Sequence, residues 1–202
     1  MTLRYDTRSR VSTYTQSWVG GEPDFGAFES IGTVTLSSST GSVGFSGIPQ
    51  TYKHLQVRVL CKTDRPTYSI DEVFFRMNSD SGSNYAAHNL SGDGSSATSA
   101  GVSTQALMRY GIFSPSTTTV HASMFGVAII DILDYANTNK YKTVRTLHGY
   151  DTNATATSYY GNATLSSGLW MSTAAITNFT MIPLTGPNFV QYSHFALYGI
   201  KA

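Results

Sequence analysis

Short runs of β-branched and aromatic residues, interrupted by turn-forming residues, dominate this sequence from residue 29 onward. Residues 55–59 and 141–147 alternate apolar and polar side chains, as half-buried strands do. Clusters of Gly, Ser, Asn and Pro separate the runs. We find no convincing amphipathic helix longer than about two turns. Similar runs occupy residues 31–36, 43–45, 73–77, 120–133, 165–171, 176–184 and 189–200. The pattern predicts about ten strands.

Strands without intervening helices predict an all-β fold, either an antiparallel β-sandwich or a barrel. Our first choice is a jelly-roll-like sandwich, and the sequence leaves the strand order open. The run at 120–133 is long enough for a helix, but its Val, Ile and Phe content and the alternation of Phe125, Val127 and Ile129 favour a long central strand. Within the run at 189–200, we expect residues 195–200 to form a core strand.

Charge is sparse in this chain. Charged residues make up 12% of it, about half the usual share, while Ser and Thr number 26 each. A net charge of +1 argues against nucleic-acid binding by phosphate neutralisation. No apolar run reaches the roughly 18 residues of a membrane span, and the first residues lack the apolar core of a signal peptide. The sole cysteine, Cys61, excludes a disulfide within the chain, and we expect it to be buried in a protein made in a reducing cytosol. So little charge suits a subunit of an assembly better than a free enzyme.

The first 28 residues differ from the rest because they show no sustained strand or helix period. They combine arginines with aromatic side chains, whereas disordered tails are normally poor in aromatics. We predict an N-terminal docking arm at residues 1–28, followed by a β-sandwich domain at residues 29–202. The alternative is a first strand and loop of the same domain. The arm residues expected to mediate assembly are Arg4, Tyr5, Arg8, Arg10, Tyr14, Trp18, Phe25 and Phe28.

Two polar segments, residues 82–101 and 151–160, are predicted to be long exposed loops. Loops rich in Tyr, Ser, Gly and Asn are typical of adaptable binding surfaces, although solvated connections are the alternative. The residues proposed as receptor contacts are Tyr85, His88, Asp93, Tyr159 and Tyr160. A core or subunit-interface role is the competing interpretation for each tyrosine, and we expect Trp170 to pack inside.

Motifs for catalysis or metal binding are absent from the sequence, so we predict no catalytic residue, no metal ligand and no cofactor. The five histidines are far apart, and no Cys or His spacing typical of zinc occurs. Residues 78–84 resemble an oxygen-rich calcium loop but contain one carboxylate, and we interpret them as a turn. Asp131 and Asp134 suggest a glycosidase pair, but strand-end residues are the better interpretation. Neither a G-x-S-x-G elbow nor a phosphate loop occurs.

Several stretches spread along the chain carry a resemblance to a known family. They are residues 29–36 (ESIGTVTL), 48–58 (IPQTYKHLQVR), 82–88 (GSNYAAH), 92–96 (GDGSS), 131–145 (DILDYANTNKYKTVR), 167–171 (SGLWM) and 192–201 (YSHFALYGIK). Over about residues 28–202, the chain resembles small virion structural proteins of tailed bacteriophages, of the aquatic, cyanophage-like type. The resemblance implies a non-enzymatic particle component in the tail or fibre region or on the capsid exterior. The resemblance implies no catalytic residues in this chain.

Together these observations give a first hypothesis: a tail- or fibre-associated virion protein that anchors by its arm and displays host-facing loops. A capsid decoration protein on the head exterior is the alternative. A glycan-binding module, or a glycan hydrolase or esterase with a site at subunit interfaces, ranks below both. Expected partners are other capsid, tail or baseplate proteins, further copies of the chain (our guess is a trimer) and a host surface glycan. We expect no nucleic-acid partner and no membrane span. The expected location is the virion, after synthesis in the host bacterial cytoplasm.

Overall fold

The computed structural model describes residues 27–66, 68–117, 123–151 and 161–201. These ranges form β-strands and contain no helix, which confirms the all-β prediction. None of them holds a helix able to cross a membrane. The strands are β1 (Phe28–Thr35), β2 (Val43–Ser46), β3 (His54–Cys61), β4 (Ile70–Met77), β5 (Tyr85–Gly92), β6 (Ala97–Gln105), β7 (Met108–Pro115), β8 (Gly126–Leu133), β9 (Lys142–Asp151), β10 (Gly161–Trp170), β11 (Asn178–Pro183) and β12 (His194–Ile200).

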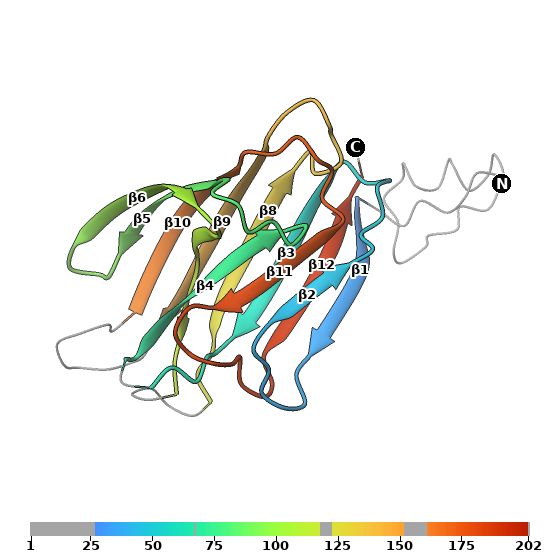
Figure 1. Ribbon diagram of the computed structural model, residues 1–202. Coiled ribbons are helices and arrows are strands. Elements are labelled where there is room, and N and C mark those ends of the chain that lie inside the picture. The colour runs from blue at the N-terminus through green and yellow to red at the C-terminus, as the bar shows by residue number, and fades with distance from the viewer. Residues whose placement is uncertain (1–26, 67, 118–122, 152–160, 202) are drawn as a thin grey trace, which may run out of the picture.

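The strands form two antiparallel sheets that pack face to face as a β-sandwich (Figure 1). The larger sheet has the order β1-β12-β3-β8-β9-β10-β5-β6, and the smaller sheet has the order β2-β11-β4-β7. In Figure 1 the smaller sheet lies in front of the larger one. The predicted core position of the last strand is confirmed, because β12 pairs with β1 on one side and β3 on the other.

The chain changes sheet repeatedly. The connections β1–β2, β2–β3, β3–β4, β4–β5, β6–β7, β7–β8, β10–β11 and β11–β12 each link the two sheets. Two hairpins, β5–β6 and β9–β10, extend the larger sheet beyond β8. The strand predicted at 120–133 is confirmed from Gly126 onward as the central strand β8. Residues 123–125, including Phe125, precede the strand, so the prediction was too long there, and residues 120–122 lie outside the described ranges. The larger sheet is therefore wide, and its outer face carries no second layer in the described part of the chain.

The core lies between the sheets because strand side chains point alternately inward and outward. In β9, for example, Val144 is buried whereas Leu147 is exposed. Phe75 and Phe179 pack in the core of the smaller sheet with their ring centroids 5.2 Å apart. Cys61 is fully buried, as predicted, and burial raises the pKa of its thiol to about 12.

Residues 82–101 do not form the predicted long loop. Most of them belong to the β5–β6 hairpin, and β5 also pairs along its length with β10. The hairpin turn is held by Asp93, whose carboxylate accepts hydrogen bonds from the backbone N–H groups of Ser95 (2.8 Å) and Ser96 (2.7 Å). The Ser, Gly and Ala residues of this stretch have a weak preference for strands. The hairpin therefore depends on backbone hydrogen bonding to its neighbours more than on side-chain propensity.

The start of the domain also differs from the prediction. Phe28, assigned to the arm from the sequence, is instead the first residue of β1 and pairs with Ile200. Just outside this pair, the backbone N–H of Lys201 donates a hydrogen bond to the carbonyl of Ala27 (3.0 Å). Sheet pairing therefore reaches the first described residues, and residues 1–26 lie outside the described part.

Candidate interaction surface

A row of apolar side chains crosses the outer face of the larger sheet. Four residues on neighbouring strands stand directly opposite one another: Ile129 pairs with Leu147, Leu147 with Leu165, and Leu165 with Leu90. Their exposed fractions are 41%, 59%, 49% and 56%, in the order Ile129, Leu147, Leu165 and Leu90. We call these four residues the apolar row. A single exposed leucine is ordinary, but an aligned set on adjacent strands forms a continuous patch.

A second, parallel set of outward residues lies two positions along the strands. Leu60 stands opposite Val127, Val127 opposite Gly149, and Gly149 opposite Ala163. Leu60 and Val127 are 39% and 56% exposed, so the apolar surface widens toward β3 and β8. Fully burying a Leu, Ile or Val side chain is worth about 1.5–3 kcal/mol. Covering side chains that are about half exposed would recover roughly half of that for each, which favours association.

A polar set borders the apolar row on its other side. It runs from Gln56 through Asp131 and Arg145 to Ser167 and His88, each opposite the next. Gln56 donates a hydrogen bond to the Asp131 carboxylate (2.9 Å). Within the described ranges no carboxylate lies within 4.0 Å of the Arg145 guanidinium. The outer face therefore combines apolar surface with Asp131 and Arg145 near its centre and with Arg58 on β3, which stands opposite Ile129 at the end of the apolar row.

Sequence reasoning missed this surface, although a signal was present. Residues 127–133 are apolar at both odd and even positions apart from Asp131, and a strand that is apolar on both faces is typical of one covered on both faces. In the structure the inner set, Ile130 and Ile132, is fully buried, while Ile129 and Leu133 face outward and are 41% and 44% exposed. The cross-strand neighbours of this run come from distant parts of the sequence, so the row itself depends on the strand order.

Tyr85 was predicted as an exposed receptor contact, and that prediction is wrong. It is fully buried at the start of β5, where its ring stacks on Trp170 with centroids 6.4 Å apart. The phenol oxygen accepts a hydrogen bond from the backbone N–H of Met77 (3.1 Å), and burial raises its pKa to about 12. Trp170 is 2% exposed, which confirms that it packs inside.

The other proposed receptor contacts lie in different places. His88 is exposed on β5, where it closes the polar set and lines an open hollow over β6 with Ser99 and Gly101. Asp93 is exposed at the hairpin turn, and its carboxylate is occupied by the turn itself. Several predicted residues lie outside the described ranges: Tyr159 and Tyr160 of the second loop, and Arg4, Tyr5, Arg8, Arg10, Tyr14, Trp18 and Phe25 of the arm.

The calcium-like segment at residues 78–84 folds as a turn closed by its own groups. The Asp80 carboxylate accepts hydrogen bonds from the indole N–H of Trp170 (2.7 Å), the side-chain amide of Asn84 (2.9 Å) and the backbone N–H of Gly82 (2.8 Å). The bond from Trp170 is the main reason that the pKa of Asp80 lies below its usual value. The Asp80 oxygens therefore stabilise the turn and its contact with Trp170. The described ranges contain no group of three His, Cys, Asp or Glu side chains that could hold a metal ion.

Asp131 and Asp134 have separate partners. Asp131 bonds to Gln56 on the outer face, while Asp134, just after β8, pairs with Lys53 (3.0 Å) and with Lys140. Hydrogen bonding to Lys140 and then Lys53 lowers the pKa of Asp134 to about 2. Asp134 agrees with the strand-end interpretation, whereas Asp131 lies within β8, paired with Gln56 and Arg145 on the neighbouring strands.

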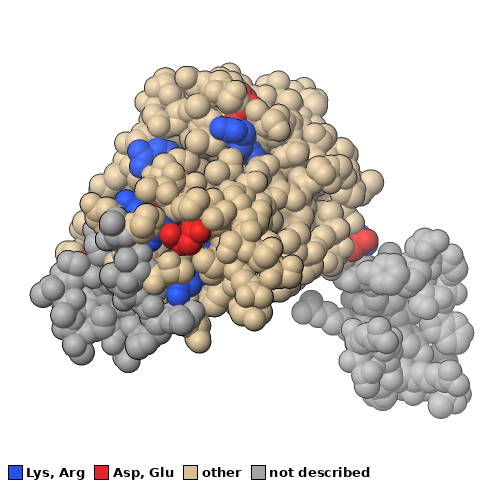
Figure 2. Space-filling model, turned by 60° about the horizontal axis from the view of Figure 1, so that its bottom comes forward, with Lys and Arg blue, Asp and Glu red and all other residues tan. Residues whose placement is uncertain are grey.

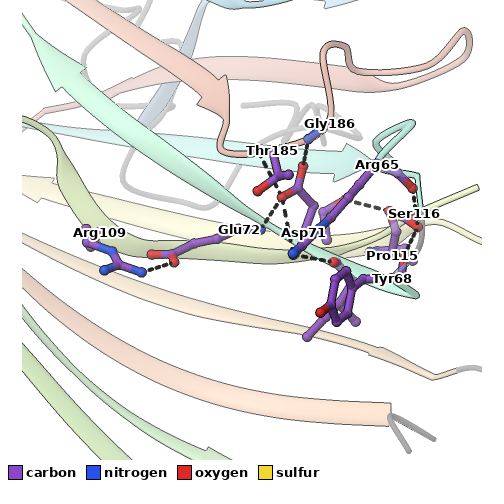
Figure 3. A network of polar contacts seen from close by, with 11 residues as sticks. Arg65, Tyr68, Asp71, Glu72, Arg109, Pro115, Ser116, Thr185 and Gly186 are labelled. Carbon is purple, nitrogen blue, oxygen red and sulfur yellow. Dashed lines mark hydrogen bonds and ion pairs between the residues drawn. The ribbon is translucent and has the colours of Figure 1, made fainter.

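A second polar network is buried at one end of the smaller sheet (Figure 3). The fully buried Asp71 carboxylate accepts hydrogen bonds from the backbone N–H groups of Thr185 (3.2 Å) and Gly186 (2.8 Å), and lies 3.8 Å from the Arg65 guanidinium. Burial nevertheless raises the pKa of Asp71, outweighing these bonds. The next residue, Glu72, forms a separate ion pair with Arg109 (2.8 Å). These contacts tie the loop after β11 to β4 and β7, which is a structural role.

Comparisons with protein-family models, with curated proteins and with solved structures find no significant match to this chain. The outer face of the larger sheet is a broad, apolar and weakly charged surface, and such a surface is suited to contact with another protein.

Proposed function

We propose that the chain is a non-enzymatic structural subunit of a tailed-phage virion, associated with the tail or fibre, which anchors by its N-terminal arm. The observation that carries this proposal is the apolar row on a sheet face that no other described part of the chain covers. A surface of this kind favours contact within a larger assembly. The resemblance of residues 28–202 to small phage virion proteins supplies the kind of assembly.

The strand order supports the same proposal. Eight strands form two groups of four, β1-β12-β3-β8 and β2-β11-β4-β7, and we interpret them as the two four-stranded sheets of a jelly roll. In this interpretation the β5–β6 and β9–β10 hairpins are additions to one sheet. Jelly rolls are frequent in viral structural proteins and in lectins, and because one fold hosts many functions, the strand order is compatible with a virion subunit without defining its role.

Low charge supports it as well. Figure 2 presents a face of the molecule on which acidic and basic side chains are few and scattered. With 12% charged residues and a net charge of +1, copies of the chain repel one another weakly. That is a disadvantage for a free protein at high concentration and an advantage for one packed among others.

Copy number in purified particles tests the proposal. Quantitative mass spectrometry should find the chain in the virion in far fewer copies than the major capsid protein, as expected for a tail or fibre component. A copy number close to that of the major capsid protein would favour the decoration alternative and overturn the tail assignment. Absence from the particle would overturn both.

A further inference from the structure

We propose that the outer face of the larger sheet is a two-fold self-association surface, on which a second copy of this chain packs sheet to sheet. The axis runs parallel to the strands between β8 and β9, so that β8 of one copy lies over β9 of the other. Two sheets packed in this way keep their strands within about 30° of each other at a spacing of about 10 Å. The inference concerns the isolated protein and does not depend on where in a virion the chain resides.

The face is large enough for a stable dimer. Six adjacent strands, β12, β3, β8, β9, β10 and β5, lie symmetrically about this axis, so that β5 of one copy lies over β12 of the other. At about 4.8 Å between strands and about 3.3 Å per residue, they present roughly 600 Å² on each copy. The pair would bury roughly 1,200 Å² in total, at the lower bound of specific protein interfaces.

The apolar side chains are complementary under this axis. A two-fold interface brings the same patch of both copies together, so each half of the patch has to fit the other half. Ile129 on β8 meets Leu147 on β9 of the second copy, and the same contact recurs on the other side of the axis. In the neighbouring set, the exposed Val127 meets Gly149, and Leu60 meets Ala163. In this second set large side chains stand over small ones. In the apolar row, Arg58 of β3 stands over Leu165 of the second copy, where the aliphatic part of the arginine side chain can cover the leucine.

The charges are complementary under the same axis. Asp131 on β8 and Arg145 on β9 stand opposite each other, so the two-fold operation places each one over its counterpart of opposite sign. Arg145 lacks a carboxylate partner within the described part of its own chain, and the second copy supplies one. A different protein could match this face, but nothing would then require its two halves to match each other.

Sedimentation equilibrium of the purified full-length chain tests the proposal. We expect a reversible dimer, and Leu147→Glu should weaken dimerisation by about 100-fold or more, because it places two carboxylates in the apolar centre. Leu184→Glu is the matched control, since Leu184 is 44% exposed but lies outside this face, and it should leave the dimer intact. A monomer at all concentrations, a trimer, or a dimer insensitive to Leu147→Glu would each overturn the proposal.

A charge exchange tests the axis itself. Asp131→Arg and Arg145→Asp should each weaken the dimer, since each places like charges over one another, and the double variant should restore it. Circular dichroism of the same samples verifies that each variant is folded. If the double variant dimerises no better than the single variants, the β8-over-β9 arrangement is wrong. A chain that dimerises in this way but is missing from particles would leave this inference standing and overturn the proposed function.

Discussion

His148 is buried and finds no polar partner among the described residues. It points into the sandwich from β9, is 3% exposed, and neither of its ring nitrogens has a hydrogen-bond partner within the described residues. Its ring packs edge-on against Phe113 with centroids 5.3 Å apart, and burial lowers its pKa to about 4. The unfolded chain has an ordinary histidine pKa of about 6.5, so between these values protons bind the unfolded state more tightly. Stability is therefore lost as the pH falls from about 6.5 to about 4.

This loss should amount to about 3 kcal/mol over the whole window. Urea unfolding at several pH values between 7 and 4 measures it, and His148→Leu should flatten the profile by removing the titration. The exposed His88→Leu is the control and should keep the native profile. Equal acid sensitivity of the native protein and His148→Leu would show that other groups cause the loss.

Asp80 holds a different buried residue in place. Removing its carboxylate in Asp80→Ala leaves the indole N–H of Trp170 without its acceptor, in a side chain that is 2% exposed. An unsatisfied buried donor costs about 1–3 kcal/mol, and we expect a loss of that size in thermal or urea unfolding. Asp93→Ala removes a carboxylate with a similar role in an exposed turn, where water replaces the lost bonds. A loss for Asp93→Ala as large as that for Asp80→Ala would contradict this account.

Residue environments were predictable from the sequence where local pattern determines them. Cys61 and Trp170 lie in apolar strand runs, and both are buried as expected. Tyr85 was misplaced because its sequence neighbours are Ser, Gly and Asn, whereas its burial depends on Trp170, which comes from β10. The burial of Asp71 could not be predicted from the sequence either, because its carboxylate accepts a hydrogen bond from the backbone of Gly186, which is 115 residues away.

At the scale of elements, β1 marks where the N-terminal arm can be removed. Deleting residues 1–26 keeps the pairing of β1 with β12, so the sandwich should stay folded while incorporation into particles is lost. Deleting residues 1–35 removes β1, exposes the edge of β12 and strips away the packing of Ile31 and Val34 against the core. That variant should unfold at a clearly lower temperature.

Thermal unfolding of both deletions and mass spectrometry of particles assembled with each provide the measurements. Normal incorporation of the shorter deletion would contradict the docking arm. Unfolding of the shorter deletion would favour the alternative from the sequence, in which the first residues belong to the same domain.

Strands were predictable individually, and their arrangement was not. Alternation located β3 and β9, and apolar content located β8, because each pattern is a local consequence of burial. The hairpin β5–β6 was missed because its strands are held by backbone pairing with each other and with β10. The residues around the hairpin carry no local pattern that predicts this pairing. The apolar row needs the order β8-β9-β10-β5, so it became visible only when these strands were placed side by side.

For the whole molecule, self-association links stability to concentration. A folded dimer that unfolds to separate chains gains stability with protein concentration by mass action, since the second copy acts as a ligand for the folded state only. For chains of this size, each tenfold increase in concentration should raise the Tm by about 2 °C. A monomer has no such dependence, so the slope reports on the assembly without any particle being present.

The same variants that test the surface give this measurement its control. Leu184→Glu should keep the native slope, whereas Leu147→Glu should unfold at a temperature independent of concentration. The Tm of Leu147→Glu at low concentration should match that of the native chain, because an exposed leucine on the outer face contributes little to the fold of one copy. If Leu147→Glu instead lowers the Tm equally at all concentrations, Leu147 stabilises the single chain and the outer face has no second copy on it.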